Sequence, residues 1–327
     1  MPTGPKNCLT DVPGLAVGHA EEEAARTGVT VVLPDAPVIC AADVRGGGPG
    51  TRETDALSQI GLVDRVDALV LSGGSVYGLA AADGVTARLG ARGQGFSLID
   101  TPGVPPSPIV PAAILYDLAN GGDKSWGEDP PYRALGGRAL DAVSADASAL
   151  GPVGAGIGAI AGAHRGGIGC ASWQMPDGAT VAALAAVNSF GSAYHPGTDR
   201  FWAAPFEVDG EFGGRGAGEG TAHGLPPDTK LGTKLAAAAR TNTTLVVVAT
   251  DAALTKPQAG RLAVMAQDGL SRAIRPAHGP TDGDVVFTLS IGEGEPASLG
   301  ELLALGTVAG DVVTRAVARG VFAAEGA

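Results

Sequence analysis

The sequence predicts an α/β (α+β) fold in which β-sheets are covered by helices within a single unit, residues 1–327. Apolar strand-like runs and longer helix-like segments occur along the whole chain, with no internal repeat of fixed period. The 327 residues are 45% hydrophobic, which is enough for a large core. Only 4% are aromatic while 52 are glycine, so layers of alanine, valine and leucine are expected to pack closely.

The first part of the chain is expected to alternate strands with turns before two helices. Apolar runs predict strands over 15–20, 27–34, 38–47, 67–74, 96–100 and 108–118. Apolar periodicity predicts helices over 76–93 and 132–146. A glycine- and alanine-rich stretch follows over 153–175.

The second part repeats this mixture around one long loop. Strands are expected over 180–194, from Thr243 to about 249, and over 284–292, with helices over 256–274 and 298–322. Thr255 and Gln258 form a capping box that fixes the start of the first of these helices. The polar, glycine- and proline-rich segment from about His195 to Thr229 predicts a long loop.

Composition excludes several classes of protein. The formal net charge is −12, with 22 basic and 34 acidic residues and no basic run, so no nucleic-acid partner is expected. Three widely spaced cysteines indicate neither a disulfide framework nor a CxxC metal site, and the five histidines show no metal-ligand spacing and suit surface or loop positions. Without a signal peptide or a long apolar span, we expect a cytoplasmic protein with no membrane partner.

Two segments invite interpretations that their context does not support. The glycines between Gly154 and Gly169 could cradle a dinucleotide, but no amphipathic helix follows them, so close strand packing or a backbone facing a substrate is the better interpretation. Ser75 in "LSGGSVYG" resembles a nucleophile elbow, but Tyr77 stands where glycine is required. A strand-to-helix turn capped by Ser75 or a neighbour is favoured instead.

The stretch "TNTTLVVVAT" places a polar cluster at the start of a buried strand. Thr243 there would ordinarily pack or hydrogen-bond locally. Asp282 and Asp284 precede a second strand, and two residues apart they would face the same side if the chain is extended there. Alone, the Asp-Gly-Asp sequence is mostly a turn signal.

Together the motifs resemble the autoprocessing L-aminopeptidase/D-esterase family, which includes the nylon-oligomer hydrolase. The resemblance covers nearly the whole chain and depends on the order and spacing of seven segments: "LTDVPGLAVGHA", "TGVTVVLP", "ADVRGGGPGTRETDAL", "LSGGSVYGLAAADGV", "VGAGIGAIAG", "NTTLVVVATDAALTKPQ" and "TDGDVVFTLS". It implies an αββα sandwich, two stacked β-sheets flanked by helices. It also implies a homo-oligomer, a tetramer of processed heterodimers.

By this resemblance the chain cuts itself between Asn242 and Thr243, giving fragments 1–242 and 243–327. Thr243 then becomes an N-terminal nucleophile that hydrolyses amide bonds. Its freed α-amine, with an ordinary pKa of about 8, can act as its base, so neither a histidine nor a cofactor or metal is needed. The resemblance assigns oxyanion donors to the Asn188 amide and the Tyr116 hydroxyl, and the orientation of Thr243 to Asp282 and Asp284.

Two departures leave the substrate open among peptides, amino-acid amides or esters, and ω-amino-acid oligomers. Threonine with two aspartates resembles the nylon-oligomer hydrolase branch, whereas the aminopeptidase branch looks as if it has serine with serine and glutamate. Yet the place of that first branch's functional lysine reads Ala163-His164-Arg165 here. Asp117 is a weak candidate for holding a substrate amine. The competing hypotheses are a non-catalytic relative and a nucleotide-binding oxidoreductase.

Overall fold

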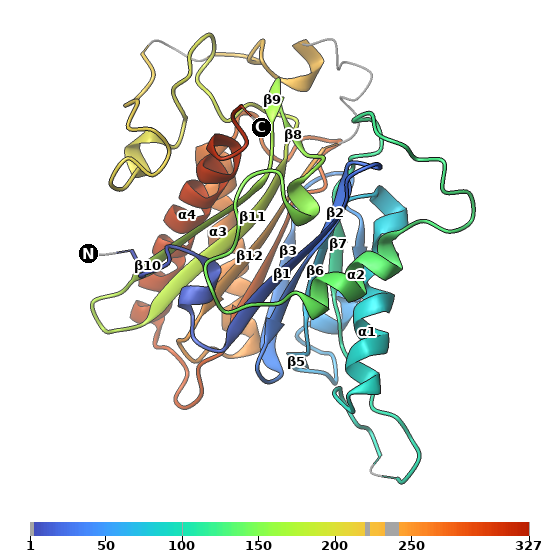
Figure 1. Cartoon of the computed structure of the whole chain (residues 1–327). Helices are drawn as coiled ribbons and strands as arrows, with labels where there is room; N and C mark the ends of the chain where they lie inside the picture. The colour runs from blue at the N-terminus through green and yellow to red at the C-terminus, as the bar shows by residue number, and fades with distance from the viewer. Residues whose placement is uncertain (1–2, 100, 220–222, 233–241, 327) are drawn as a thin grey trace.

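Two β-sheets stack face to face in the computed structural model, which describes residues 3–99, 101–219, 223–232 and 242–326 (Figure 1). The first sheet has the strand order β1 (Leu15–Glu22), β2 (Thr27–Pro34), β6 (Leu69–Ser72), β7 (Ala112–Ile114) and β4 (Thr51–Arg52). The second has the order β10 (Ile168–Gln174), β11 (Thr180–Asn188), β12 (Thr243–Thr250), β13 (Val285–Ser290), β3 (Val38–Val44) and β5 (Arg65–Val66). A small hairpin pairs β8 (Ile160–Ala161) with β9 (His164–Arg165).

Among the described residues, four α-helices cover the outer faces of the two sheets. α1 (Ala81–Ala91) and α2 (Tyr132–Asp141) pack on the first sheet, and α3 (Lys256–Ala273) and α4 (Leu299–Phe322) pack on the second (Figure 1). The capping box of α3 is confirmed: Gln258 N donates to Thr255 Oγ1, and Thr255 N donates 2.8 Å to Gln258 Oε1. Two mixed sheets flanked by helices confirm the expected αββα arrangement.

The central strands of the second sheet are buried on both faces, which explains their continuous apolar runs. In β12, Val246 and Val248 pack toward α3 and α4, whereas Leu245 and Val247 pack toward the first sheet. Side chains alternate along a strand, so Thr243 shares the face of Leu245 and is directed between the sheets.

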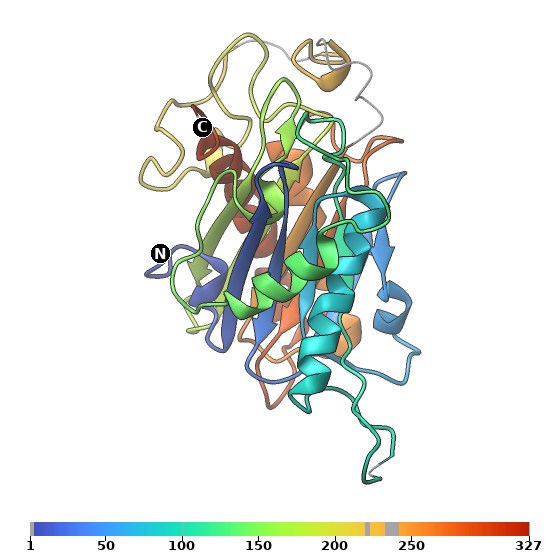
Figure 2. The same cartoon turned by 45° about the vertical axis from the view of Figure 1, so that its right-hand side comes forward.

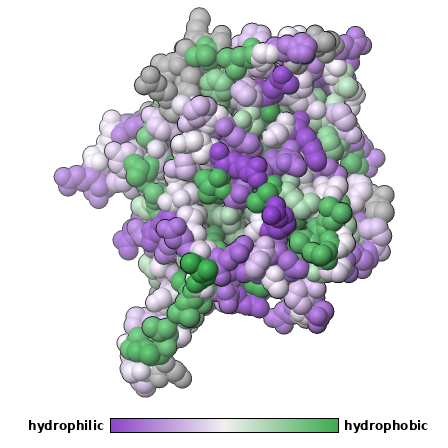
Figure 3. Space-filling model, turned by 180° about the vertical axis from the view of Figure 1, so that it is seen from behind, coloured by the Kyte–Doolittle hydropathy of each residue, from purple (hydrophilic) through white to green (hydrophobic). Residues whose placement is uncertain are grey.

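Some expected elements are shorter or absent. The strand expected over 96–100 is wrong for residues 96–99, which form only one bridge, Phe96 to Ser107, while residue 100 lies outside the described part. Leu98 and Ile99 are exposed on a projecting arm whose apolar atoms are visible in Figure 3. Because this arm has no neighbouring sheet to cover it, its apolar residues do not build a ladder.

Other strands and helices have boundaries that differ from the expected ones. The strand expected over 108–118 is reduced to β7, since Pro108 and Pro111 lack an N–H for a ladder. The helix expected from residue 76 begins as the 3₁₀ turn Ser75–Ala80, and α2 ends at Asp141. Ser75 caps nothing: the 3₁₀ turn and α1 have no side-chain cap, and Ser75 has a left-handed φ of 52°. This turn is shaped by Gly74, also left-handed with φ 84°. Figure 2 shows α1 in cyan and α2 in green side by side over the first sheet.

The long loop expected over 195–229 is confirmed for its described residues, which contain only a 3₁₀ turn at Ala204–Phe206 and an isolated bridge at Phe201. Within the part of the chain that the structure describes, none of the helices combines the length and apolar character that crossing a bilayer requires.

Candidate active site

The first residue of β12 lies next to the carbonyl group of the residue before it. Asn242 and Thr243 are only 2% and 3% exposed. The Thr243 hydroxyl donates a hydrogen bond to the carbonyl oxygen of Asn242, and that same oxygen accepts a hydrogen bond of 2.9 Å from the amide of Gly283. The carbonyl between these two residues therefore has a fixed backbone donor on one side and a hydroxyl on the other.

Strand pairing puts Gly283 in this position. β12 and β13 run parallel with Leu245 opposite Val285, and a further bridge joins Asn242 to Asp282. A Cβ atom added to Gly283 would lie 2.5 Å from Thr243 Oγ1, so only glycine fits against the hydroxyl.

The glycines of "RGGGPG" brace the same segment from the other side. Gly48 N donates to the carbonyl oxygen of Asp282 over 2.7 Å, and Gly46 N donates to that of Asp284 over 3.3 Å. A Cβ atom on Gly46 would lie 2.3 Å from the Asp282 carbonyl oxygen. This close approach gives the glycine-rich motif a structural role beside Thr243.

Asp282 and Asp284 are both buried here but have different partners. Both precede β13, which begins at Val285, so the strand does not itself set their directions. Asp284 Oδ1 accepts a hydrogen bond of 2.7 Å from Thr244 N, while Asp282 Oδ2 accepts one of 2.7 Å from Gly279 N. Burial and the charge of Asp284 raise the pKa of Asp282 to about 6.

Asn188 pairs with Thr243 across the β11–β12 ladder. Its Nδ2 donates 3.0 Å to the main-chain carbonyl of Tyr116, and its Oδ1 accepts 2.9 Å from Ile160 N. The structure thus brings four of the predicted residues, Asn188, Thr243, Asp282 and Asp284, to adjoining ends of three strands. Tyr116 joins them through its main chain.

Lys230 is a residue that sequence reasoning missed. It is 2% exposed in the 3₁₀ turn Lys230–Gly232, and its Nζ lies 3.3 Å from both the carbonyl oxygen and Oδ1 of Asn188. Burial lowers its pKa to about 7, although Asp282 opposes this shift. No pattern in the polar loop distinguishes this lysine from a solvated one.

His278 was also missed, because isolated histidines suit surface or loop positions. Its Nδ1 lies 2.9 Å from Asp284 Oδ2, and its backbone N donates 3.0 Å to the same oxygen. The only sequence signal was its place six residues before an aspartate at a strand start.

Asp117 is hydrogen-bonded to two residues of the first sheet and its turns. Its carboxylate accepts a hydrogen bond of 2.6 Å from Thr27 Oγ1 and one of 2.7 Å from Gly74 N, and burial raises its pKa to about 6. Its two oxygens are thus occupied by Thr27 at the start of β2 and by Gly74 in the turn after β6, and a role in holding a substrate amine gains no support.

The glycine run packs backbone against backbone, as the alternative to a dinucleotide loop predicted. A Cβ atom on Gly166 would lie 1.8 Å from the carbonyl oxygen of Val187, and one on Gly169 would lie 1.9 Å from that of Ala316 in α4. The run leads into β10 and not into a helix, so the strand–loop–helix context of a dinucleotide site is absent from residues 153–175.

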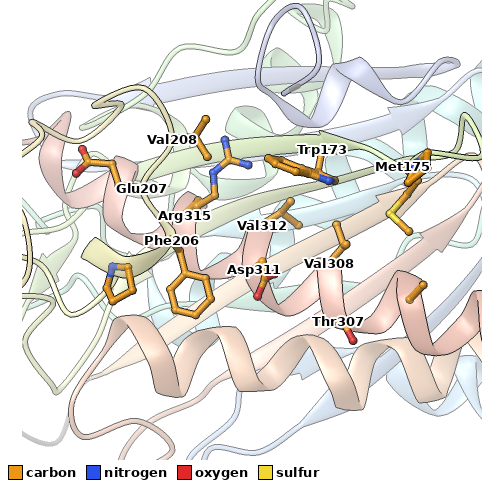
Figure 4. Close-up of a pocket in the computed structure, with 13 residues that line it drawn as sticks. Trp173, Met175, Phe206, Glu207, Val208, Thr307, Val308, Asp311, Val312 and Arg315 are labelled. Atoms are coloured by element: carbon orange, nitrogen blue, oxygen red, sulfur yellow. The ribbon is translucent and has the colours of Figure 1, made fainter. Parts of the chain in front are cut away.

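A pocket of about 660 Å³ lies on the outer side of the second sheet, between β10, α4 and the turn Ala204–Phe206 (Figure 4). Trp173, Phe206 and Val312 are among its apolar lining, and none of the predicted site residues lines it. Its Trp173 pairs with Val181, which pairs with Thr250 at the opposite end of β12 from Thr243. This pocket is therefore separate from the candidate active site.

Comparison with known proteins identifies the family. The model of peptidase family S58 matches residues 7–327. An uncharacterized aminopeptidase of Mycobacterium tuberculosis is 42% identical, covering 98% of this chain and 94% of that protein. A 6-aminohexanoate-oligomer endohydrolase of Kocuria is 29% identical, covering 96% and 86%.

Among solved structures, the L-aminopeptidase D-Ala-esterase/amidase of Ochrobactrum anthropi, described as a variant of the Ntn-hydrolase fold, superposes with a TM-score of 0.71. It is 23% identical and covers 99% of this chain and 88% of its own. The shared fold agrees with the stacked sheets described above. The chain belongs to peptidase family S58 and is a hydrolase of the aminopeptidase/amidase type.

Proposed function

We propose that this chain cuts its own Asn242–Thr243 bond and then hydrolyses external amide bonds with Thr243 as an N-terminal nucleophile. The observation that carries the proposal is the carbonyl of Asn242, which lies between the Thr243 hydroxyl and the Gly283 amide. A hydroxyl next to a carbonyl with a fixed donor is what an intramolecular acyl shift requires.

In the first reaction, Thr243 Oγ1 attacks the Asn242 carbonyl carbon and the Gly283 amide stabilises the oxyanion. The C–N bond breaks, the hydroxyl proton passes to the departing nitrogen, and Asn242 is left as an ester on Thr243. The departing nitrogen is then the free α-amine of Thr243, and water hydrolyses the ester to the Asn242 carboxylate and the free Thr243 hydroxyl. The products are residues 1–242 and 243–327.

The fold supports a stable pair of fragments after the cut. β12 and β13 would belong to the smaller fragment, but they pair with β11 and β3 of the larger one. The ladders and the core between the sheets would hold the two together.

In the second reaction the freed amine acts as base while Thr243 Oγ1 attacks a substrate carbonyl, forming an acyl-enzyme that water resolves. Asn188, held against Lys230, and the Tyr116 hydroxyl are proposed as oxyanion donors. Asp282 and Asp284 are proposed to orient the amine and hydroxyl of Thr243. Each well-placed donor contributes about 3 kcal/mol to the transition state.

The names of the relatives support two kinds of substrate: peptides with a free amino terminus, from the aminopeptidase, and 6-aminohexanoate oligomers, from the endohydrolase. Amino-acid amides or esters are a third candidate, from the family resemblance. On resemblance alone, we also propose that processed pairs assemble into oligomers. A cytoplasmic location is proposed from the sequence, which has three widely spaced cysteines.

The test is hydrolysis of amino-acid amides, dipeptides and 6-aminohexanoate oligomers by wild type, Thr243→Ser and Thr243→Ala. Wild type should turn over at least one class, the serine variant should keep measurable activity because it keeps a hydroxyl, and the alanine variant should have none. Turnover by Thr243→Ala would exclude Thr243 as nucleophile. Absence of turnover in wild type would favour a non-catalytic relative.

A further inference from the structure

His278 has an unusual backbone conformation that directs two donors at one oxygen. Its φ is 57°, in the left-handed region that only a few per cent of non-glycine residues enter, asparagine, aspartate and histidine among the more frequent. There, its backbone N and its Nδ1 lie 3.0 Å and 2.9 Å from Asp284 Oδ2. A carboxylate only accepts hydrogen bonds, so Nδ1 carries the proton of this contact.

The other oxygen of Asp284 faces the nucleophile's strand. Asp284 Oδ1 accepts 2.7 Å from the amide of Thr244, the residue after Thr243. The Asp284 side chain is only 4% exposed, and a buried carboxylate is stable only when charged or polar groups compensate its lost hydration. One line of hydrogen bonds therefore joins His278 to the start of β12.

We propose that His278 is a positioning residue for the nucleophile, acting through Asp284. Its Nδ1–H keeps the Asp284 carboxylate turned so that Oδ1 holds the Thr244 amide, which in turn fixes the direction of the Thr243 hydroxyl. The inference rests on the proposed function, because it assigns to His278 an effect on reactions of Thr243. Among the described residues, the side chain of His278 is bonded to Asp284 and not to Thr243, so it serves neither as base nor as acid.

The alternative is that His278 matters only for the shape of its turn. Three substitutions separate the two. His278→Asn keeps an N–H donor near the place of Nδ1 and tolerates the left-handed conformation. His278→Gly tolerates the same conformation and keeps the backbone donor, but has no side-chain donor. His278→Ala lacks the side-chain donor and disfavours the conformation.

The experiment measures self-cleavage rates by electrophoresis, and kcat and KM of the processed enzyme, for wild type and the three variants. Thermal melting of each variant monitors the fold. His278→Gly and His278→Ala should lower the self-cleavage rate and kcat by about 10- to 100-fold, as loss of an orienting hydrogen bond does elsewhere, with KM within about 2-fold. His278→Asn should recover most of both rates.

Equal rates for His278→Gly and His278→Asn would overturn the inference, since the side-chain donor would then be dispensable. A rise in KM of about 10- to 100-fold with unchanged kcat in His278→Gly and His278→Ala would also overturn it. If wild type itself neither cuts nor hydrolyses, the proposed function fails and this inference falls with it. Self-cleavage by wild type with unaffected variants removes only the role of His278.

Discussion

Asp117 and Asp284 are two buried aspartates with similar local chemistry and different neighbours. They are 2% and 3% exposed, and each accepts hydrogen bonds from a backbone amide and from a side chain. Asp117 closes the turn after β6 in the first sheet, with Thr27 and Gly74 as its partners. Asp284 accepts a hydrogen bond from the backbone of β12 in the second sheet, at Thr244, the residue after Thr243.

The comparison teaches that burial does not identify a functional carboxylate. Burial raises the pKa of Asp117 to about 6, yet its oxygens hold a turn together. What distinguishes Asp284 is that it accepts a hydrogen bond from the amide of Thr244, the residue after Thr243, whose hydroxyl donates to the Asn242 carbonyl. The predictions below test whether connection to Thr243 decides the effect of a substitution.

The largest difference is expected between Asp284→Asn and Asp117→Asn in self-cleavage. Three N–H groups converge on the Asp284 carboxylate, and an asparagine offers only one acceptor oxygen, so one donor would face an NH₂ group. We expect Asp284→Asn to slow self-cleavage by about 100-fold or more, equivalent to about 3 kcal/mol. Asp117→Asn should stay within about 3-fold of wild type, since the Asp117 carboxylate is bonded to Thr27 and Gly74 of the first sheet and not to the start of β12. Time courses on denaturing gels measure both, and equal losses would contradict the comparison.

Gly283→Ala tests the same connection from the parallel strand. Its new methyl group would lie 2.5 Å from Thr243 Oγ1 and 3.0 Å from the carbonyl oxygen of Gly48, which forces the hydroxyl or the backbone to move. A displacement of this kind should slow self-cleavage by about 100-fold. Gly300→Ala, whose Cβ would meet nothing within 4 Å, is the matched control and should cut normally. Unimpaired cutting by Gly283→Ala would show that the Thr243–Gly283 approach is not needed.

The smallest effect is on stability and concerns Asp117. Because its pKa in the folded chain is raised from 3.8 to about 6, the folded state binds more protons than the unfolded state between those values. Protonated Asp117 therefore contributes its full share to the free energy of unfolding below about pH 4, and this contribution is lost as pH rises through about 6.

Asp117→Asn removes this titration. In a Thr243→Ala background, where every molecule is one uncut chain, its stability relative to the parent should rise by roughly 1 to 3 kcal/mol between pH 4 and pH 7. Urea unfolding at several pH values measures the difference. A constant difference would mean that Asp117 titrates normally in the folded chain.

Long apolar runs made most of the fold predictable. β11, β12, α3 and α4 follow directly from apolar pattern and, for α3, from the Thr255 capping box. The strand expected at 96–100 failed because apolar residues build a ladder only where another strand can pair with them.

The candidate site was predictable only in part. Thr243, Asp282 and Asp284 belong to motifs that carried the family resemblance, and the resemblance in turn implied Asn188. Lys230 reaches Asn188 from a segment 42 residues away, and nothing in its local sequence reports such a contact. His278 lies only six residues before Asp284, but an isolated histidine in a polar turn does not indicate that its Nδ1 meets that carboxylate. The hydrogen-bond partners of Asp117 were equally unpredictable, because Thr27 and Gly74 are distant in sequence and meet its carboxylate only in the folded first sheet.

Intact mass and N-terminal sequencing of the purified protein, after incubation near neutral pH, test the central claim most directly. We expect two fragments, residues 1–242 and 243–327, with the smaller beginning Thr-Thr-Leu. The Thr243→Ala variant should remain uncleaved. An intact wild-type chain, or a cut at any other bond, would contradict this claim.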